Sequence, residues 1–198
     1  MATVGSSSRK SAIGARFSFG LVKIKTHYPL RYRLDNKDRF LIWFTVDGAD
    51  EDSDGVVLNE EREILVFVSR EEVFSYCDSR QLDVERDYDC LHNFDVVTKW
   101  MKRKKSKWFG PTAIDCKEFL GTWNLFGDIS RSLHGDFDTD RERTSKIYEK
   151  LFYGNNLPSI TPEGKHYTPY WPNREKRIIR EVLSHGLQMF RNHLRLHR

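Results

Sequence analysis

Apolar residues recur at two different spacings along this chain, and the spacing changes near its middle. The segments 40–46 (FLIWFTV) and 63–69 (EILVFVS) are continuous runs rich in aromatic and β-branched side chains, which is typical of buried strands. We therefore expect these two segments to pair with each other. Alternating apolar residues in 17–24 predict a further strand. Turn-forming residues in 27–30 and 35–38 predict turns between the strands.

Beyond residue 90, apolar side chains recur at intervals of three and four, which is the spacing of an amphipathic helix. This spacing predicts helices over 91–104, 112–133, 141–153 and 173–194. A shorter helix is predicted after Ser69, which forms a capping box with Glu72. Strands come first and helices follow, so the pattern predicts an α+β fold. A small antiparallel sheet from the N-terminal half would pack with helices of the C-terminal half.

The helix predicted over 112–133 is apolar around most of its circumference, and such a helix belongs in the interior of a domain. Trp123 and Phe126 lie on its apolar face. Asn124 and Asp128 stand one turn apart on the remaining polar strip, where they can bond each other or a neighbouring element. We interpret these four residues as scaffold that holds the fold together.

Two further features of this helix predict its start and its packing. Thr112 with Asp115 three residues later resembles a capping box, so the helix is expected to begin there. Gly121 and Gly127 each cost about 1 kcal/mol relative to alanine inside a helix. We therefore expect another backbone to pass close to both glycines.

A long segment, 154–172, separates the last two predicted helices and contains four prolines. Loops of this length are either functional or held down by their own side chains. Tyr167, Tyr170 and Trp171 supply three aromatic rings, and we expect them to pin the loop across the core.

The length of 198 residues suits one domain with its own hydrophobic core. Residues 1–16 are small, Ser-rich and basic, so we expect a flexible arm followed by a single domain over 17–198. No apolar run approaches the roughly 18 residues needed to span a bilayer, and the first residues lack the apolar stretch of a secretory signal. We expect a cytoplasmic protein that does not bind membranes. The three cysteines show no CxxC spacing and are expected to be reduced thiols.

Charge is distributed unevenly along the chain. The net charge is +4, yet the segment 47–62 holds seven acidic residues and one basic residue. Within it, residues 50–61 match the spacing of an EF-hand calcium loop, although the segments on both sides read as strands rather than helices. Three interpretations stay open: a calcium loop, a solvated hairpin loop, and an acidic docking surface for a basic partner. The docking surface would consist of Asp50, Asp52, Asp54, Glu60 and Glu61.

The segment 99–109 interleaves six cations with two tryptophans and a phenylalanine. Such a composition occurs on surfaces that grip phosphates and stack on bases. It also fits a helix end whose tryptophan packs inward while the lysines complement the helix dipole. The terminal helix allows the same two interpretations. The residues proposed for nucleic-acid binding are Lys102, Arg103, Lys104, Lys105 and Lys107.

No catalytic constellation is visible in the sequence. The chain contains no phosphate-binding loop, no G-x-G-x-x-G after a strand and no G-x-S-x-G motif. His193 and His197 have the spacing of metal ligands on a helix, but they end one residue before the last residue, where a helix frays. We therefore expect a protein that is not an enzyme and that uses no cofactor or metal ion.

The second half of the chain carries three distinctive segments. They are the Trp-Asn-Leu-Phe-x-Asp motif within 116–129 (CKEFLGTWNLFGDI), the segment 151–162 (LFYGNNLPSITP), and 167–171 (YTPYW) before an amphipathic final helix. Through these segments, roughly residues 94–194 resemble small bacterial immunity proteins. These proteins are the antidotes encoded beside polymorphic toxins, including the toxins of contact-dependent growth inhibition.

This resemblance implies a cytoplasmic binding protein that neutralises one cognate toxin, often a nuclease, by steric occlusion. Members of such families share a scaffold while their toxin-contacting residues differ, so the resemblance assigns no binding residue. If the resemblance holds, we expect the acidic segment 47–61 of this basic chain to complement a cationic toxin cleft. A nucleic-acid-binding protein that uses 99–109 and the terminal helix is the alternative.

Overall fold

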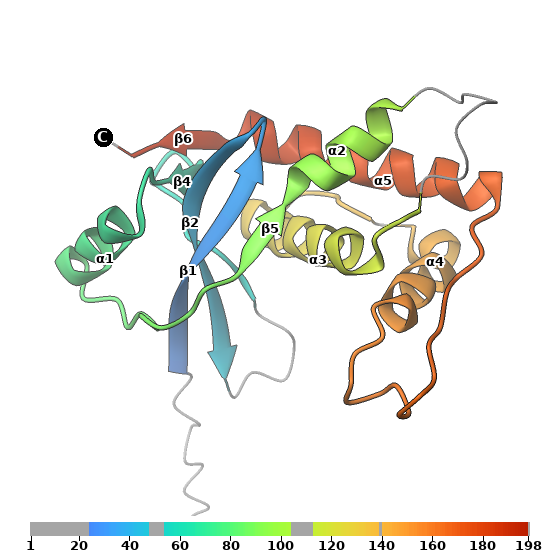
Figure 1. The fold of residues 1–198 in the computed structure, drawn as a ribbon. Coiled ribbons are helices and arrows are strands. Elements are labelled where there is room, and N and C mark those ends of the chain that lie inside the picture. Colours follow the sequence, from blue (N-terminus) through green and yellow to red (C-terminus); the bar gives the residue numbers. More distant parts are fainter. Residues whose placement is uncertain (1–23, 48–53, 104–112, 139, 198) are drawn as a thin grey trace, which may run out of the picture.

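The computed structural model describes residues 24–47, 54–103, 113–138 and 140–197. It begins with a long hairpin of β1 (Ile24–Leu34) and β2 (Lys37–Asp47), which pair antiparallel along their whole length (Figure 1). Asp35 and Asn36 connect the strands with φ angles of 53° and 57°. Positive φ at both positions is the signature of a type I′ turn, which matches the twist of a hairpin. The turn predicted over 35–38 is confirmed.

The turn predicted over 27–30 is wrong, because β1 continues straight through Pro29. The amide N–H of His27 donates to the Asp83 carbonyl oxygen (2.9 Å), on the side of β1 that faces away from β2. Pro29 lies two residues further along the strand and has the same orientation. Its missing N–H is therefore not needed for pairing with β2, and the strand tolerates the proline.

Two short strands complete this sheet, which has the order β3-β2-β1-β5. β3 (Gly55–Val56) pairs antiparallel with β2, and β5 (Leu91–Asn93) pairs parallel with β1. A second sheet consists of β4 (Ile64–Val66) and β6 (Leu194–Leu196), which run parallel. The predicted pairing of 63–69 with 40–46 is wrong except for one bridge between Phe40 and Phe67. The predicted strand over 17–24 and arm over 1–16 lie outside the described residues, apart from Ile24.

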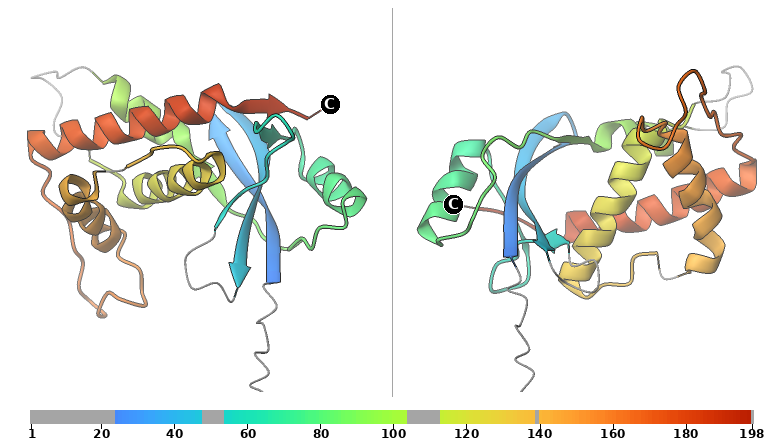
Figure 2. Two further views of the ribbon diagram at one scale, coloured as in Figure 1. Left: turned by 180° about the vertical axis from the view of Figure 1, so that it is seen from behind. Right: turned by 90° about the horizontal axis from the view of Figure 1, so that it is seen from below.

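The helices are α1 (Arg70–Ser79), α2 (Phe94–Lys102), α3 (Cys116–Leu133), α4 (Arg141–Gly154) and α5 (Asn173–Asn192). α1 lies on one face of the hairpin, while α3, α4 and α5 lie on the other (Figure 2). The fold is therefore α+β, with a mixed, mostly antiparallel N-terminal sheet packed against C-terminal helices. No helix in the described part of the chain is both long and apolar enough to cross a membrane.

β2 is buried on both faces, which explains its continuous apolar sequence. Leu41 packs into the large core with Leu30 of β1 and the helices α2 to α5, whereas Ile42 faces the smaller core under α1. Val73 and Cys77 of α1 are fully buried in that smaller core. Ser69 caps α1 as predicted, since its hydroxyl oxygen accepts the Glu72 N–H.

α3 is the buried helix that the sequence predicts. Trp123 and Phe126 are 3% and 1% exposed, and the Phe126 ring lies against Phe94 and Phe137. The predicted start at Thr112 is wrong. The helix begins at Cys116, and the Asp115 carboxylate accepts the Glu118 N–H as its N-cap.

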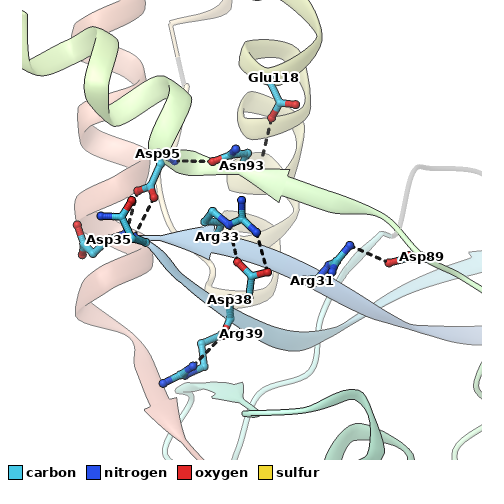
Figure 3. A network of polar contacts seen from close by, with 10 residues as sticks. Arg31, Arg33, Asp35, Asp38, Arg39, Asp89, Asn93, Asp95 and Glu118 are labelled. Atoms are coloured by element: carbon cyan, nitrogen blue, oxygen red, sulfur yellow. Dashed lines mark hydrogen bonds and ion pairs between the residues drawn. The ribbon is translucent and has the colours of Figure 1, made fainter.

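A polar network joins the hairpin to the helices (Figure 3). The Asp95 carboxylate, which is largely buried, accepts the backbone N–H groups of Asp35 and Asn36 at 2.8 and 2.9 Å. At the start of α2, the Asn93 side chain accepts the Asp95 N–H, and the Glu118 carboxylate of α3 accepts the Asn93 N–H. The helix predicted from residue 91 therefore begins at Phe94, and residues 91–93 form β5 instead.

α5 ends earlier than the predicted 173–194, because residues 194–196 form β6. Backbone bonds hold this strand beside β4: the Ile64 N–H donates to the His193 carbonyl oxygen (2.6 Å), and the His197 N–H donates to that of Val66 (2.8 Å). His193 and His197 consequently do not share a helix face. Pairing with the open edge of β4 outweighs continued helical periodicity at this end.

Candidate functional site

An open groove of about 1050 Å³ lies along the polar strip of α3, and we call it the α3 groove. Its walls come from β2, the segment before β5 and the start of α4. The lining residues used below are Trp43, Asp54, His92, Gly121, Asn124, Gly127, Asp128, Arg131, Asp138, Arg141, Tyr148 and Glu149. No single stretch of sequence predicts this site, because its residues come from four separate regions of the chain.

The polar residues of α3 bond the walls of the groove. The Trp43 indole N–H of β2 donates to the Asp128 carboxylate (2.8 Å). The Tyr148 hydroxyl of α4 donates to the Asn124 side-chain oxygen (2.8 Å). Asn124 and Asp128 therefore connect α3 to neighbouring elements, which was one of the two arrangements expected for them, and they line the groove as well as supporting the fold.

The two glycines of α3 leave the helix bare along the groove. A Cβ atom at Gly127 would meet no side chain or other element of the described structure within 4 Å. At Gly121 the nearest atom would be Nδ1 of His92, at 3.4 Å. The expectation that another backbone passes close to both glycines is therefore wrong, since both face open space or a side chain.

The groove carries more negative than positive charge. Among the described residues that line it are four carboxylates and two guanidinium groups. One of these cations, Arg131, is already engaged: it pairs with Asp128 and donates to the Asp54 carbonyl oxygen. The groove is thus acidic, although the whole chain has a net charge of +4.

Asp138 holds a carboxylate oxygen that has no hydrogen-bond donor. Its Oδ2 atom accepts the Trp123 indole N–H (2.9 Å), whereas Oδ1 is buried and has no partner in the described part of the chain. A buried carboxylate oxygen without a donor is unfavourable by about 1–3 kcal/mol. Asp138 therefore keeps a negative charge at the groove wall that one donor, the Trp123 indole N–H, satisfies only in part.

His92 adds a partly buried imidazole to the wall. Burial lowers the pKa of His92 below its ordinary value of 6.5, and a backbone hydrogen bond at Gly121 opposes that shift. The ring is consequently neutral at physiological pH and contributes no positive charge to the groove.

The acidic segment lies at the end of α3 next to this groove. Its main chain is anchored there, because the Val56 N–H donates to the Ser132 hydroxyl (2.8 Å) and the Arg62 guanidinium donates to the Ser132 carbonyl oxygen (2.9 Å). Glu60 and Glu61 point outward and are exposed. Asp54 lines the groove itself. Asp50 and Asp52 lie outside the described residues.

The structural context of the calcium-loop pattern is not that of an EF-hand. β2 precedes it, and the glycine expected to form the sharp turn, Gly55, belongs to β3. The flanking elements are strands, as the sequence indicates, so the helix–loop–helix arrangement does not form.

The basic segment is only partly described. Lys102 and Arg103 are exposed at the end of α2, while Lys104, Lys105 and Lys107 lie outside the described residues. Trp100 is 6% exposed and packs edge-on against Phe119. It is therefore a core residue and does not form a base-stacking surface.

Some arginines of the terminal helix also act within the fold. The Arg180 guanidinium lies 4.9 Å above the Trp100 ring and donates to the Met101 carbonyl oxygen. Arg191 pairs with Asp35 at 2.7 Å. These contacts fit the interpretation of this helix as an amphipathic core helix with a polar outer face.

The loop 154–172 is held by fewer aromatic rings than expected. Trp171 is buried, but Tyr170 is 81% exposed and Tyr167 is also exposed. The Asn156 side chain instead bonds both the N–H and the carbonyl oxygen of Tyr167. The loop is pinned by Trp171 and by this amide, and the two tyrosines remain at the surface.

Comparison with known proteins shows that the fold resembles a solved structure, but it assigns the chain to no family. No family model matches the chain, and no curated protein matches its sequence. The structure is similar to the crystal structure of the SatS C-terminal domain in complex with bromine. The TM-score is 0.50 with 14% sequence identity, over 86% of this chain and 94% of that one. At this identity the likeness concerns the fold alone.

Proposed function

We propose that the protein is an immunity protein that binds a cognate toxin domain, such as a nuclease, and neutralises it by steric occlusion. The observation that carries this proposal is the presentation of the acidic segment. β3 and Ser132 hold its main chain against the sheet and α3, so that Glu60 and Glu61 face outward. The resemblance of residues 94–194 to immunity proteins supports the same function.

The mechanism follows from charge and size. A toxin that acts on nucleic acid has a cationic substrate cleft, and exposed carboxylates accelerate encounter with such a surface. Once the complex forms, the body of the immunity protein excludes the substrate. Neutralisation of this kind needs no reaction at the interface and takes place inside the cell that makes the toxin.

Protection of cells tests the function directly. The candidate toxin domain, taken from the gene next to this one, is expressed in a sensitive host with and without this protein, and survival is counted. We expect wild-type protein to restore survival and to bind the purified toxin domain. Failure to restore survival or to bind that domain would overturn the proposal.

Charge reversal tests the role of the acidic segment. Glu60→Lys with Glu61→Lys should weaken toxin binding at least tenfold, as measured by calorimetry. The matched control is Glu71→Lys with Asp87→Lys, two exposed carboxylates outside both the acidic segment and the groove, which should change the affinity less than twofold. Nanomolar binding to RNA or DNA that is lost on changing Lys102 to Glu would favour the nucleic-acid function instead.

A further inference from the structure

We infer that the α3 groove receives an extended, positively charged segment of the protein partner. This inference rests on the proposed function and names the part of the toxin that the groove recognises. The groove volume of about 1050 Å³ lies at the upper end of the roughly 300–1,000 Å³ that small-molecule sites occupy. It has room for a short peptide segment.

The bare surface of α3 gives the segment access to the helix. A Cβ atom at Gly127 would meet no side chain or other element of the described structure within 4 Å, and one at Gly121 would meet only the His92 ring. A partner backbone can therefore approach α3 more closely than it can approach a helix with side chains on every turn. Helix glycines with no packing neighbour in their own protein are otherwise unfavourable by about 1 kcal/mol each.

The chemistry of the walls selects a cation. Asp138 presents a buried oxygen that lacks a donor, and Glu149 is exposed at the rim. Arg131 is paired with Asp128, so the described lining residues leave three carboxylates, Asp54, Asp138 and Glu149, against one guanidinium group, Arg141. A phosphate backbone would instead be repelled.

The groove is continuous with the acidic segment through Asp54. This residue lines the groove, and its carbonyl oxygen accepts a hydrogen bond from Arg131 of α3. Glu60 and Glu61 follow a few residues later on the outer surface. One cationic partner surface can therefore contact both the outer carboxylates and the groove. The outer carboxylates steer its approach, and the groove binds one of its segments.

A peptide titration tests the groove without the toxin. Fluorescein-labelled nona-arginine is titrated with the full chain at 50 mM NaCl and followed by fluorescence anisotropy, with nona-glutamate as the negative control. We expect binding of nona-arginine only. Absence of nona-arginine binding, or equal binding of nona-glutamate, would overturn the inference.

Two substitutions at Gly127 form a matched pair. Gly127→Lys and Gly127→Glu both add a long side chain where space is open, so both should fold normally, which urea unfolding verifies. We expect Lys to lower nona-arginine affinity at least tenfold and Glu to lower it less than threefold. Glu71→Lys, on α1 behind the sheet, should change it less than twofold. Equal losses for Gly127→Lys and Glu71→Lys would place the binding elsewhere and refute the inference.

The basic N-terminal residues of this chain are the competing occupant. Arg9, Lys10 and Arg16 lie in a segment without acidic residues. Changing all three to Glu in the full chain should leave nona-arginine affinity within twofold. If the affinity instead rises severalfold, the chain's own arm occupies the groove, and the inference of a partner segment is wrong.

Cell protection separates this inference from the proposed function. Gly127→Lys should lose protection against the cognate toxin, while Glu71→Lys should retain it. If Gly127→Lys protects as well as wild type, the groove inference fails and the immunity function stands. If wild type fails to protect, the immunity function itself fails.

Discussion

At the scale of single residues, glycine has opposite roles at two helix positions. Gly127 of α3 faces open space, whereas Gly186 of α5 lies against the core. A Cβ atom at Gly186 would clash with the Phe126 ring and would come within 2.7 Å of Phe137. The close packing that the sequence suggests for Gly127 therefore occurs at Gly186, and helical periodicity alone does not distinguish the two.

Alanine at these two positions should shift stability in opposite directions. Gly186→Ala forces the aromatic core to move and should lower the free energy of unfolding by about 1–3 kcal/mol. Gly127→Ala meets no obstacle and should raise it by about 0.5–1 kcal/mol through helix propensity. Urea unfolding of both variants measures the difference. Equal effects of the two substitutions would contradict the packing described for α3 and α5.

At the scale of elements, local sequence signals identify which helices and strands form. They are less informative about where each element ends and which element it pairs with. The hairpin turn at Asp35–Asn36, the buried strand over 40–46 and the buried helix α3 all follow from local sequence. The end of α5 does not, because residues 194–196 keep apolar spacing but pair with β4, which is distant in sequence. The start of α3 was misplaced because Asp115 with Glu118 offers a second capping signal three residues after Thr112.

Removal of the last strand should destabilise the whole fold. Deleting residues 193–198 removes the backbone partners of Ile64 and Val66 and uncovers Phe67, which the His197 ring contacts. We expect a loss of about 2–4 kcal/mol from hydrogen bonds and apolar burial together. Urea unfolding and hydrogen exchange at the Ile64 amide provide the measurement. Deleting Arg198 alone is the control, and an equal loss there would contradict a role for β6.

At the scale of the whole molecule, the general architecture follows from the sequence and the site does not. Strands before helices predict an α+β fold, and the structure has one. The α3 groove combines side chains from β2, α3 and α4, together with Asp54 and Asp138. Only the tertiary arrangement brings them together, so Trp43, Asp138, Tyr148 and Glu149 give no signal that reading along the chain could find.

Two imidazoles should make the stability of the molecule depend on pH. Burial is the main cause that lowers the pKa of both His27 and His92 below 6.5 in the folded state. As pH falls through 6.5, the unfolded chain takes up protons before the folded one does. The stability of the folded state is therefore complete above pH 6.5 and decreases below it.

Unfolding free energies at pH 7.5 and 5.5 test this expectation. The decrease should be smaller in His27→Asn and in His92→Asn than in wild type, because each variant lacks one of the two groups. His166→Asn, at an exposed position, should behave as wild type does. A decrease that persists in the double variant of His27 and His92 would assign the pH dependence to other groups.

The pairing of β4 with β6 also sets the earliest time during synthesis at which the fold can be completed. The two strands are about 130 residues apart, and ribosomes add about 5–20 residues per second. Each newly made chain therefore waits roughly ten seconds with the edge of β4 unpaired, and the second sheet forms only once β6 has been synthesised.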